Sequence, residues 1–366
     1  MREVANARRP VVVFSTPRSG STLLSCLLDA TGYIGMLNEP AFYPRPTGVA
    51  PPRVLKTWTQ RSLYLQSLWS APPRVTYPEA ARALCEIATQ SPSRPLPIAG
   101  LWRWYGERVA DLRGRQAWGH KQPDGPGWWR QELVLMPEAH AVILLREPVS
   151  VAASFFGRGW GVLWRGGPYP PEVRAAAAAL AIRGLVQPLA EAIYELPSNR
   201  RTVVRYEDLA TSPEATLESL SPVLGNQDWS AAVRDFTETP IARHASRNKE
   251  LHDSLRRPID PSVARRWRDG LAPDHLRILQ VVLAEAGQRL GYPSSGSANA
   301  LTKTEVAAVR RAERTLAWLR TTRRTREQVG GRAKWLLSAM PPSVSRAILA
   351  ERSPTMREWR ERAASI

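Results

Sequence analysis

Residues 11–28 read VVVFSTPRSGSTLLSCLL, a β-branched run followed by a short polar loop and an apolar, helix-forming segment. A strand that enters a helix through a tight loop directs free backbone N–H groups and the positive end of the helix dipole at one spot. Gly20 permits close approach of a ligand, Ser21 and Thr22 add hydroxyl donors, and Arg18 supplies positive charge. The stretch therefore predicts a phosphate-binding loop, with an ordinary capped helix after a β-turn as the alternative.

Beyond this stretch, short β-branched runs alternate with helical segments, which is typical of an α/β fold with a central parallel sheet flanked by helices. The expected strands are 11–15, 33–37, 117–121, 141–145 and 202–206. The expected helices are 21–30, 79–90, 148–156, 172–195, 213–224 and 273–290. Prolines are frequent between Pro40 and Pro97, so we expect an irregular insertion there, interrupted by helix 79–90 and continuing to about residue 116.

The composition indicates an anionic partner. The chain has 366 residues, of which 43% are hydrophobic, and a formal net charge of +18. It is long enough to bury a substantial core, and its charge fits nucleic acid, an acidic membrane surface or a phosphorylated small molecule. Residues 301–366 carry half of the positive excess, so the rest of the chain is less basic than the total charge suggests.

Cysteine and hydropathy patterns predict a cytoplasmic protein without a metal site. Cys26 and Cys85 lack CxxC spacing, which argues against both a disulfide framework and a zinc site. The apolar run 11–14 is too short for a signal peptide. The Ala-rich stretch 175–182 ends at Arg183, short of the ~20 apolar residues that span a bilayer.

Two motifs together resemble the signatures of the PAPS-dependent sulfotransferases, which use 3′-phosphoadenosine 5′-phosphosulfate (PAPS) as sulfuryl donor. The PRSGST loop resembles the first, which holds the 5′-phosphosulfate, and it continues as in bacterial members that sulfate carbohydrates and lipids. The second is an arginine at a strand end with a serine eight residues later, which hold the 3′-phosphate, and Arg146 and Ser154 have that separation. The resemblance implies a P-loop-like sulfotransferase fold. The alternative for Arg146 is a pairing with Glu147 or another carboxylate.

Weaker matches extend the resemblance over roughly residues 10–270. Tyr206 opens a Tyr-Glu-Asp segment whose tyrosine lies against adenine in the family. Lys121 lies in a Gly-x-Lys-x-Pro segment whose lysine meets the transferring sulfuryl group. The segment from Ser246 to Arg257 resembles the loop that folds over the nucleotide. The implied nucleotide-binding residues are Arg18, Ser19, Gly20, Ser21, Thr22, Arg146, Ser154, Tyr206, Ser246 and Arg257.

Sulfuryl transfer by in-line displacement requires cations near the leaving phosphate and a base near the attacking hydroxyl. Arg18 and Lys121 are the expected cations. Glu39 matches the glutamate that serves as the proposed base in Golgi-type and bacterial relatives, and His120 is the alternative base. Neighbouring residues of a strand point to opposite faces, so His120 turns away if Lys121 faces the sulfate. We therefore expect Glu39 to be the base.

The resemblance implies transfer of a sulfuryl group from PAPS to a hydroxyl of a small-molecule, glycan or glycolipid acceptor, with 3′,5′-ADP as product. A nucleotide kinase is disfavoured because the loop has no Gly-Lys pair. A nucleic-acid-binding protein is disfavoured because the sequence shows no helix-turn-helix, zinc-finger or aromatic-basic sheet signature. The region 40–116 and a group of aromatic residues are expected either to shape the acceptor site or to pack in the core. These residues are Trp102, Trp104, Tyr105, Trp128, Trp129, Trp160 and Trp164.

A change in composition after Tyr292-Pro293 predicts a domain boundary. The expected parts are a sulfotransferase catalytic domain over 1–296 and a basic helical C-terminal tail over 297–366. In the tail, apolar residues recur at helical spacing with arginines outside the stripe; they are Val306, Val309, Ala312, Leu316 and Leu319. Such a helix lies on an anionic membrane, binds a partner or second copy, or docks on the body.

Overall fold

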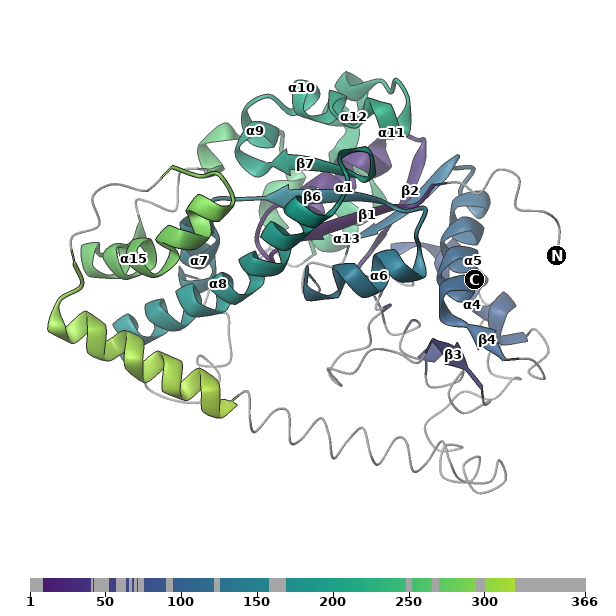
Figure 1. The fold of residues 1–366 in the computed structure, drawn as a ribbon. Helices are drawn as coiled ribbons and strands as arrows, with labels where there is room; N and C mark the ends of the chain where they lie inside the picture. Colours follow the sequence, from purple (N-terminus) through teal and green to yellow (C-terminus); the bar gives the residue numbers. More distant parts are fainter. Residues whose placement is uncertain are drawn as a thin grey trace.

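The computed structural model describes residues 9–40, 42, 53–56, 64–65, 68, 71, 76–89, 95–121, 126–157, 169–247, 252–264, 270–293 and 300–319. A five-stranded parallel sheet with the strand order β2-β5-β1-β6-β7 lies at the centre (Figure 1). Its strands are β1 (Val11–Ser15), β2 (Ile34–Asn38), β5 (Ala117–Lys121), β6 (His140–Leu145) and β7 (Arg201–Arg205). The predicted parallel sheet is confirmed, and each strand lies within one residue of its expected bounds.

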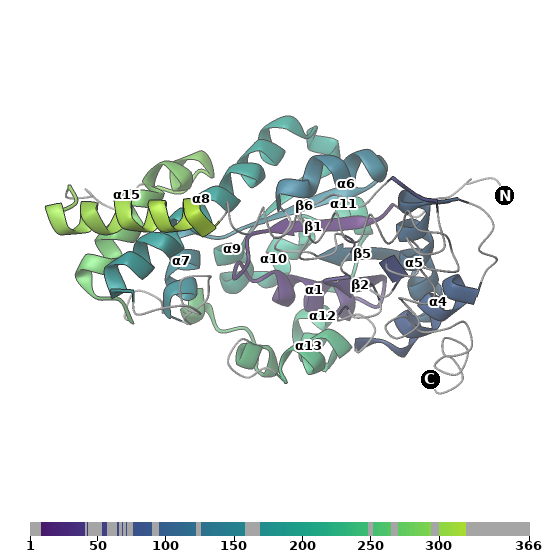
Figure 2. The same cartoon turned by 90° about the horizontal axis from the view of Figure 1, so that it is seen from below.

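The sheet is buried because helices cover both of its faces (Figure 2). The helices α1 (Ser21–Ala30), α12 (Trp229–Asp235) and α13 (Pro240–Ala245) lie on one face. The helices α6 (Trp129–Leu135) and α8 (Pro171–Glu195) lie on the other. Every residue of β1, β2, β5 and β6 is buried. Parallel strands covered in this way read as continuous apolar runs, which is why the sequence locates them.

Three helices pack together around α8. The helices α7 (Pro148–Gly157) and α15 (Pro273–Arg289) both contact α8. Among the described helices, α8 is the one long and apolar enough to cross a membrane by length and composition. More than half of its most apolar window is buried inside the protein. This burial is typical of a core helix.

The region after β2 is more regular than the sequence predicts. The expected helix 79–90 is present as α4 (Pro78–Thr89), and a small antiparallel pair joins β3 (Val54–Leu55) to β4 (Leu96–Pro97). The expectation of irregular chain up to residue 116 is wrong over α5 (Ile98–Leu112). Within this helix, a Cβ at Gly106 would lie 2.2 Å from the Trp118 ring. This glycine therefore serves close packing between α5 and β5.

The part of the chain that follows β7 consists of short helices. They are α9 (Tyr206–Thr211), α10 (Pro213–Glu218) and α11 (Ser221–Leu224), followed by α12 and α13. The single helix expected over 213–224 is therefore two helices. The second helix begins at Ser221 with a proline in its first turn, a position that proline favours because it lacks an N–H group.

The first part of the basic tail docks on the body as a helix over 303–319. Its N-terminus is a reciprocal cap, in which Glu305 accepts from the Thr302 N–H at 2.7 Å and Thr302 Oγ1 accepts from the Glu305 N–H. Glu305 also accepts from Arg277 Nε of α15 at 2.8 Å. Of the predicted apolar stripe, Ala312 is fully buried, and Val309, Leu316 and Leu319 pack against the core.

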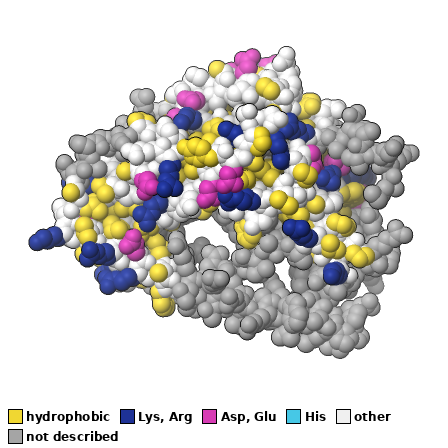
Figure 3. Space-filling view, viewed as in Figure 1, with side chains coloured by type: hydrophobic (Ala, Val, Ile, Leu, Met, Phe, Trp, Pro, Cys, Tyr) yellow, Lys and Arg dark blue, Asp and Glu magenta, His cyan; other side chains and the backbone are white. Residues whose placement is uncertain are grey.

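The outer face of this docked helix is basic. Arg310, Arg311 and Arg314 are exposed, and Figure 3 shows basic side chains gathered at that end of the molecule. Of the readings open at the sequence level, the structure favours docking for residues 303–319. Residues 320–366 and the predicted domain boundary after residue 296 lie outside the described residues, so the two-domain division stays a prediction.

Candidate functional site

The predicted phosphate loop joins the carboxyl end of β1 to α1. Within it the Ser19 N–H donates to the Thr16 carbonyl at 3.3 Å, and the two hydroxyls share a short hydrogen bond. Gly20 caps α1 with φ +88° and supplies no side-chain acceptor to the first turn of the helix. Amide groups of that turn therefore face the loop, as anion binding requires.

Gly20 is required here by contact as well as by conformation. A Cβ at this position would lie 2.3 Å from Cδ2 of Tyr206, the first residue of α9. The Arg146 guanidinium lies 4.3 Å from the centre of the same tyrosine ring. The register explains the meeting, because Leu145 pairs with Arg205 across β6 and β7, and the next residue of each strand leaves the sheet at the same edge. Tyr206 thus joins the loop to Arg146.

Arg146 and Ser154 converge, as predicted, but they do so through Arg18. Arg146 Nη1 donates to the Arg18 carbonyl at 2.9 Å, and Arg18 Nε donates to Ser154 Oγ at 3.3 Å. Arg146 makes no ion pair with any described carboxylate, and its Nε is buried without a hydrogen-bond partner in that part of the chain. This orphaned donor fits a site that receives an anion from outside the chain.

A second group lies where β2 and β5 end. The Lys121 side chain is 1% exposed, and its Nζ donates to Thr22 Oγ1 at 3.1 Å and to Glu39 Oε1 at 2.9 Å. The Glu39 N–H donates to the Lys121 carbonyl at 2.8 Å. Because Thr22 belongs to α1, Lys121 bridges the phosphate loop and the predicted base. The Glu39 side chain is 36% exposed, so it remains open to an acceptor.

Backbone strain falls on both halves of this site. Arg18 has φ +68° and Glu39 has φ +57°, and no other described residue except glycine has a positive φ. Positive φ costs energy for a residue with a Cβ and persists only where the surroundings enforce it. The structure therefore fixes the two residues that the sequence predicts as a cation and the base.

His120 lies on the opposite face of β5 from Lys121, as the strand periodicity predicts. It is 1% exposed, and its Nε2 forms a short hydrogen bond with Glu132 of α6. Phe42 packs edge-on against its ring, with the ring centres 4.8 Å apart. His120 is thus buried in the core beneath the sheet, and Glu39 is the candidate base that contacts Lys121.

The late loop is only partly described. Ser246 follows α13, is 6% exposed, and accepts a hydrogen bond from Arg256 Nη2 on its carbonyl at 2.9 Å. Arg257 instead points outward and donates to Asp253 at 2.8 Å, and no described contact joins it to residues 16–22. In this structure Arg256, not Arg257, is the arginine attached to Ser246.

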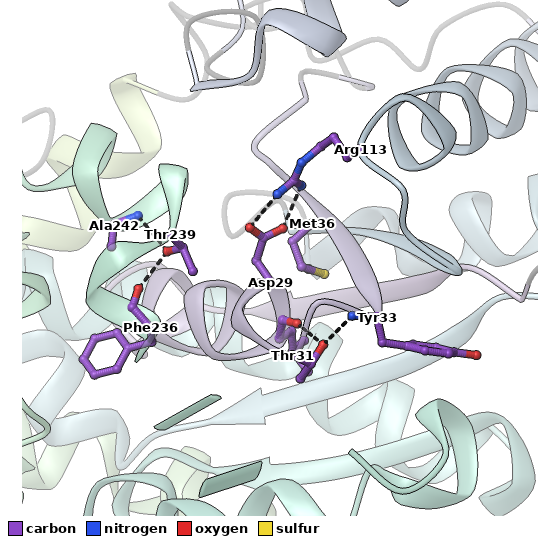
Figure 4. Close-up of polar contacts among 9 residues, drawn as sticks. Asp29, Thr31, Tyr33, Met36, Arg113, Phe236, Thr239 and Ala242 are labelled. Atoms are coloured by element: carbon purple, nitrogen blue, oxygen red, sulfur yellow. Dashed lines mark hydrogen bonds and ion pairs between the residues drawn. The ribbon is translucent and has the colours of Figure 1, made fainter. Parts of the chain in front are cut away.

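A buried ion pair that the sequence does not reveal fixes the far end of α1 (Figure 4). Asp29 receives two hydrogen bonds from Arg113, at 2.8 and 2.9 Å, and a third from the Met36 N–H at 3.0 Å. The Arg113 guanidinium also lies 4.0 Å from the centre of the Tyr77 ring. Burial alone would lower the pKa of Arg113, but its hydrogen bonds and charge contact with Asp29 raise that pKa overall. This pair holds α1, β2 and α5 together.

The aromatic residues proposed for the acceptor pocket are largely in the core. Trp102 and Tyr105 are at most 1% exposed, and Trp129 is 4% exposed. Trp104 and Trp128 are half-buried against the core. Trp160 and Trp164 lie outside the described residues. For Trp102, Tyr105 and Trp129 the structure therefore supports the packing role rather than a pocket wall.

One group of side chains comes close to a metal-binding arrangement. Ligand atoms of Glu172, Asp274 and His275 lie within 4.8 Å of one another where α8 and α15 begin. Carboxylates in the first turn of a helix are stabilised by the helix dipole, and His275 packs against Phe156. These contacts account for the group without an ion. That the protein needs no metal stays a prediction.

The comparison with known proteins agrees with this geometry. The model of the sulfotransferase family matches residues 10–231. This range covers β1 and the phosphate loop, the Lys121 and Arg146 segments and Tyr206. It is more than half of the chain, and the protein therefore belongs to the sulfotransferase family.

Individual relatives are distant. The chain is 27% identical over 173 residues to the nodulation protein NoeE of Sinorhizobium fredii, which is 44% of this chain and 41% of that protein. The chain thus spans about two fifths of the length of this curated relative. In structure it is similar to the sulfotransferase domain of the curacin biosynthetic pathway, with TM-score 0.53, 19% identity, and coverage of 78% of this chain and 98% of that one. A sulfotransferase domain of the Synechococcus PCC 7002 olefin synthase also gives TM-score 0.53, at 21% identity over 78% and 96% of the two chains. These likenesses support the P-loop-like sulfotransferase fold.

Proposed function

We propose that this protein transfers a sulfuryl group from PAPS to a hydroxyl of a small-molecule, glycan or glycolipid acceptor and releases 3′,5′-ADP. The observation that carries the proposal is the convergence on Arg18. The Arg18 carbonyl accepts a hydrogen bond from Arg146, and Arg18 Nε donates one to Ser154. These bonds join the loop before α1 to the pair that is predicted to bind the 3′-phosphate. Membership of the sulfotransferase family supports the same reaction class.

The residues present fit a nucleotide with phosphate groups at two positions. Bound PAPS would supply an activated sulfuryl group. Residues 18–22 would hold the 5′-phosphosulfate through the amides and hydroxyls at the start of α1. Arg146 and Ser154 would hold the 3′-phosphate, for which the Nε of Arg146, without a hydrogen-bond partner among the described residues, offers a donor. Tyr206 would place its ring against the adenine of the nucleotide.

The contacts of Lys121 define its role. An ammonium group 2.9 Å from Glu39 and 3.1 Å from Thr22 stands between the base and the phosphate loop. In that place it stabilises charge on the oxygens of the transferring group. Glu39 takes the proton from the acceptor hydroxyl. Because Lys121 is almost fully buried, its charge acts in a region screened from water, where such stabilisation is strongest.

Nucleotide binding is the first test. Titration calorimetry should show that the protein binds 3′,5′-ADP and does not require Mg²⁺, whereas ATP with Mg²⁺ binds more weakly. Tight binding of ATP with Mg²⁺ and none of 3′,5′-ADP would contradict the proposal and favour a kinase-like enzyme. Incubation with labelled PAPS and a metabolite extract, followed by mass spectrometry, then identifies the acceptor.

The base is tested by Glu39→Gln. This variant keeps the size of the side chain and an oxygen acceptor for Lys121 but removes the basic carboxylate. We expect turnover to be abolished while the affinity for 3′,5′-ADP stays within about twofold, because removal of a general base typically costs 10²–10⁴ in rate. Glu218→Gln, on the exposed surface of α10, is the matched control and should retain full activity. Near-normal turnover of Glu39→Gln would exclude Glu39 as the base.

The cellular setting is part of the proposal. We place the protein in the cytoplasm, with membrane contact, partner binding or dimerisation as roles for the basic tail and no role for nucleic acid. The exposed arginines of the docked helix supply the charge that an anionic membrane would attract. Liposome binding of the full chain, compared with a variant in which Arg310, Arg311 and Arg314 are changed to glutamine, tests the membrane role of the docked helix. A chain lacking residues 320–366 tests the rest of the tail in the same assay. Equal binding by all three proteins would rule out the tail as the membrane contact.

A further inference from the structure

Two glutamates leave the sheet side by side next to the proposed 3′-phosphate site. Leu145 of β6 pairs with Arg205 of β7, so Glu147 and Glu207 each lie two residues beyond a paired position. The Glu207 carboxylate crosses between the two chain segments and accepts the Glu147 N–H on Oε1 at 2.9 Å. Arg146 and Tyr206, which lie between these contacts and the strands, are thereby held at a fixed separation.

The second oxygen of Glu207 is bound from a distant part of the chain. The Tyr292 hydroxyl donates to Glu207 Oε2 at 2.9 Å. Burial raises the pKa of the Tyr292 phenol, and the adjacent Glu207 charge raises it further. The phenol therefore stays protonated and remains a donor. A carboxylate bound on both oxygens has less freedom to rotate than one bound on a single oxygen.

Arg205, the residue before Tyr206, also contacts the segment around Tyr292. Its guanidinium lies 4.5 Å from the centre of the Tyr292 ring, and its Nη2 donates to the Leu290 carbonyl at 3.0 Å. Gly291 has φ +72°, and a Cβ there would lie 3.1 Å from Arg205 Nη2. Both neighbours of Tyr206 in the sequence therefore hold residues 290–292, which directly follow α15.

We infer that Glu207 and Tyr292 are positioning residues of the nucleotide site, which set the placement of Arg146 and Tyr206 through the Glu147 amide. The inference rests on the proposed function, since it assigns Glu207 and Tyr292 to the positioning of the groups that bind the 3′-phosphate and the adenine. The segment that follows α15 then contributes to the binding of the sulfuryl donor. Helix 303–319 contacts α15 through Arg277 and Glu305, so the docked part of the tail supports this segment as well.

The decisive variant is Tyr292→Phe, which keeps the ring on Arg205 and removes only the hydroxyl. We expect it to weaken 3′,5′-ADP binding roughly tenfold, since a hydrogen bond to a charged group is lost. Glu207→Ala should weaken binding more, and Glu207→Gln should recover part of the loss because its amide oxygen still accepts the Glu147 N–H. Tyr194→Phe is the matched control, because Tyr194 is 77% exposed on α8.

Coupling between the two residues gives a second criterion. If Tyr292 acts through Glu207, Tyr292→Phe should add nothing to the loss in a Glu207→Ala background, whereas independent effects would add. Calorimetric titration of the four proteins with 3′,5′-ADP measures this directly. Should Glu207→Ala fail to fold, Glu207→Met serves the same comparison, because its side chain is of similar length and has no oxygen to accept from the Tyr292 hydroxyl.

Hydrogen exchange of the nucleotide-free protein separates this inference from the proposed function. In Tyr292→Phe, the backbone amides over residues 146–150 should exchange faster than in wild type. If wild type does not bind 3′,5′-ADP, the proposed function fails, and this measurement still decides whether Tyr292 holds the turn. The inference is overturned if Tyr292→Phe lowers only the melting temperature, leaving exchange of these amides and any nucleotide affinity at wild-type values.

Discussion

Replacing Arg113 by alanine should remove a large part of the stability of this protein. The change deletes both hydrogen bonds that Arg113 makes to Asp29 and leaves a carboxylate whose side chain is 1% exposed. The remaining described hydrogen bond to it comes from the Met36 N–H at 3.0 Å. Breaking a buried pair in this way costs about 3–5 kcal/mol, which compares with a total of about 5–15 kcal/mol for a typical domain.

The same helix provides a control. Arg108 of α5 also binds a carboxylate through two hydrogen bonds, to Glu86 at 2.7 and 2.8 Å, but both side chains are about one third exposed. Arg108→Ala should therefore cost at most about 1 kcal/mol, particularly since Arg82 remains near Glu86 at 3.4 Å.

Urea unfolding at pH 7 measures both variants against wild type, and an unchanged slope shows that stability alone has changed. The double variant Asp29→Asn with Arg113→Met removes both charges and keeps an acceptor for the Met36 N–H. It should recover much of the loss. If Arg113→Ala is no more destabilising than Arg108→Ala, the reasoning from burial is refuted.

Two further predictions concern the loop and the pH range. Gly20→Ala should weaken 3′,5′-ADP binding at least tenfold, because the new Cβ would lie 2.3 Å from Tyr206 at a residue with φ +88°. Gly114→Ala, at φ +66° and with open space around it, should bind the nucleotide as wild type does. Equal calorimetric affinities of the two variants would contradict this prediction. Burial, together with the nearby Arg9 and Arg200 charges, lowers the pKa of His140 to about 4. Between the ordinary pKa of about 6.5 and the lowered value of about 4, the unfolded chain binds more protons than the folded one. The stability from this group is therefore complete above pH 6.5 and falls by on the order of 3 kcal/mol as the pH drops to about 4. Unfolding of His140→Gln at pH 7.5 and 4.5 should show a smaller difference than wild type, and an equal difference would assign the pH dependence elsewhere.

Most of the sheet was predictable from the sequence because β1, β2, β5 and β6 are buried on both faces and therefore stand out as short apolar runs. The pairs that share one motif were predictable for a similar reason. Arg146 and Ser154 are close in the chain, and the turn at Pro148 brings the start of α7 back beside the end of β6. The opposed directions of His120 and Lys121 follow from the strand periodicity alone.

Other features depend on contacts that the order of residues does not reveal. Asp29 meets Arg113, and Glu207 meets Tyr292, across more than 80 positions of sequence. Finding these pairs requires the order of the strands and the packing of α5 and α15. The apolar spacing of α5 could have predicted that helix, but the frequent prolines before it favoured irregular chain. The close packing of Gly106 against Trp118 is a contact that the sequence does not reveal. The role of Arg257 at the nucleotide stays a prediction, since in this structure its guanidinium binds Asp253.

The central place of β1 in the sheet has a consequence for how the chain acquires its structure. Its two hydrogen-bonded neighbours, β5 and β6, begin at residues 117 and 140, and the ring that covers Gly20 belongs to Tyr206. A chain emerging from the ribosome at about 5–20 residues per second therefore carries an exposed, unpaired β1 for several seconds. Closing such long loops is slow. The phosphate loop is thus synthesised well before the strands and the tyrosine ring that complete its surroundings.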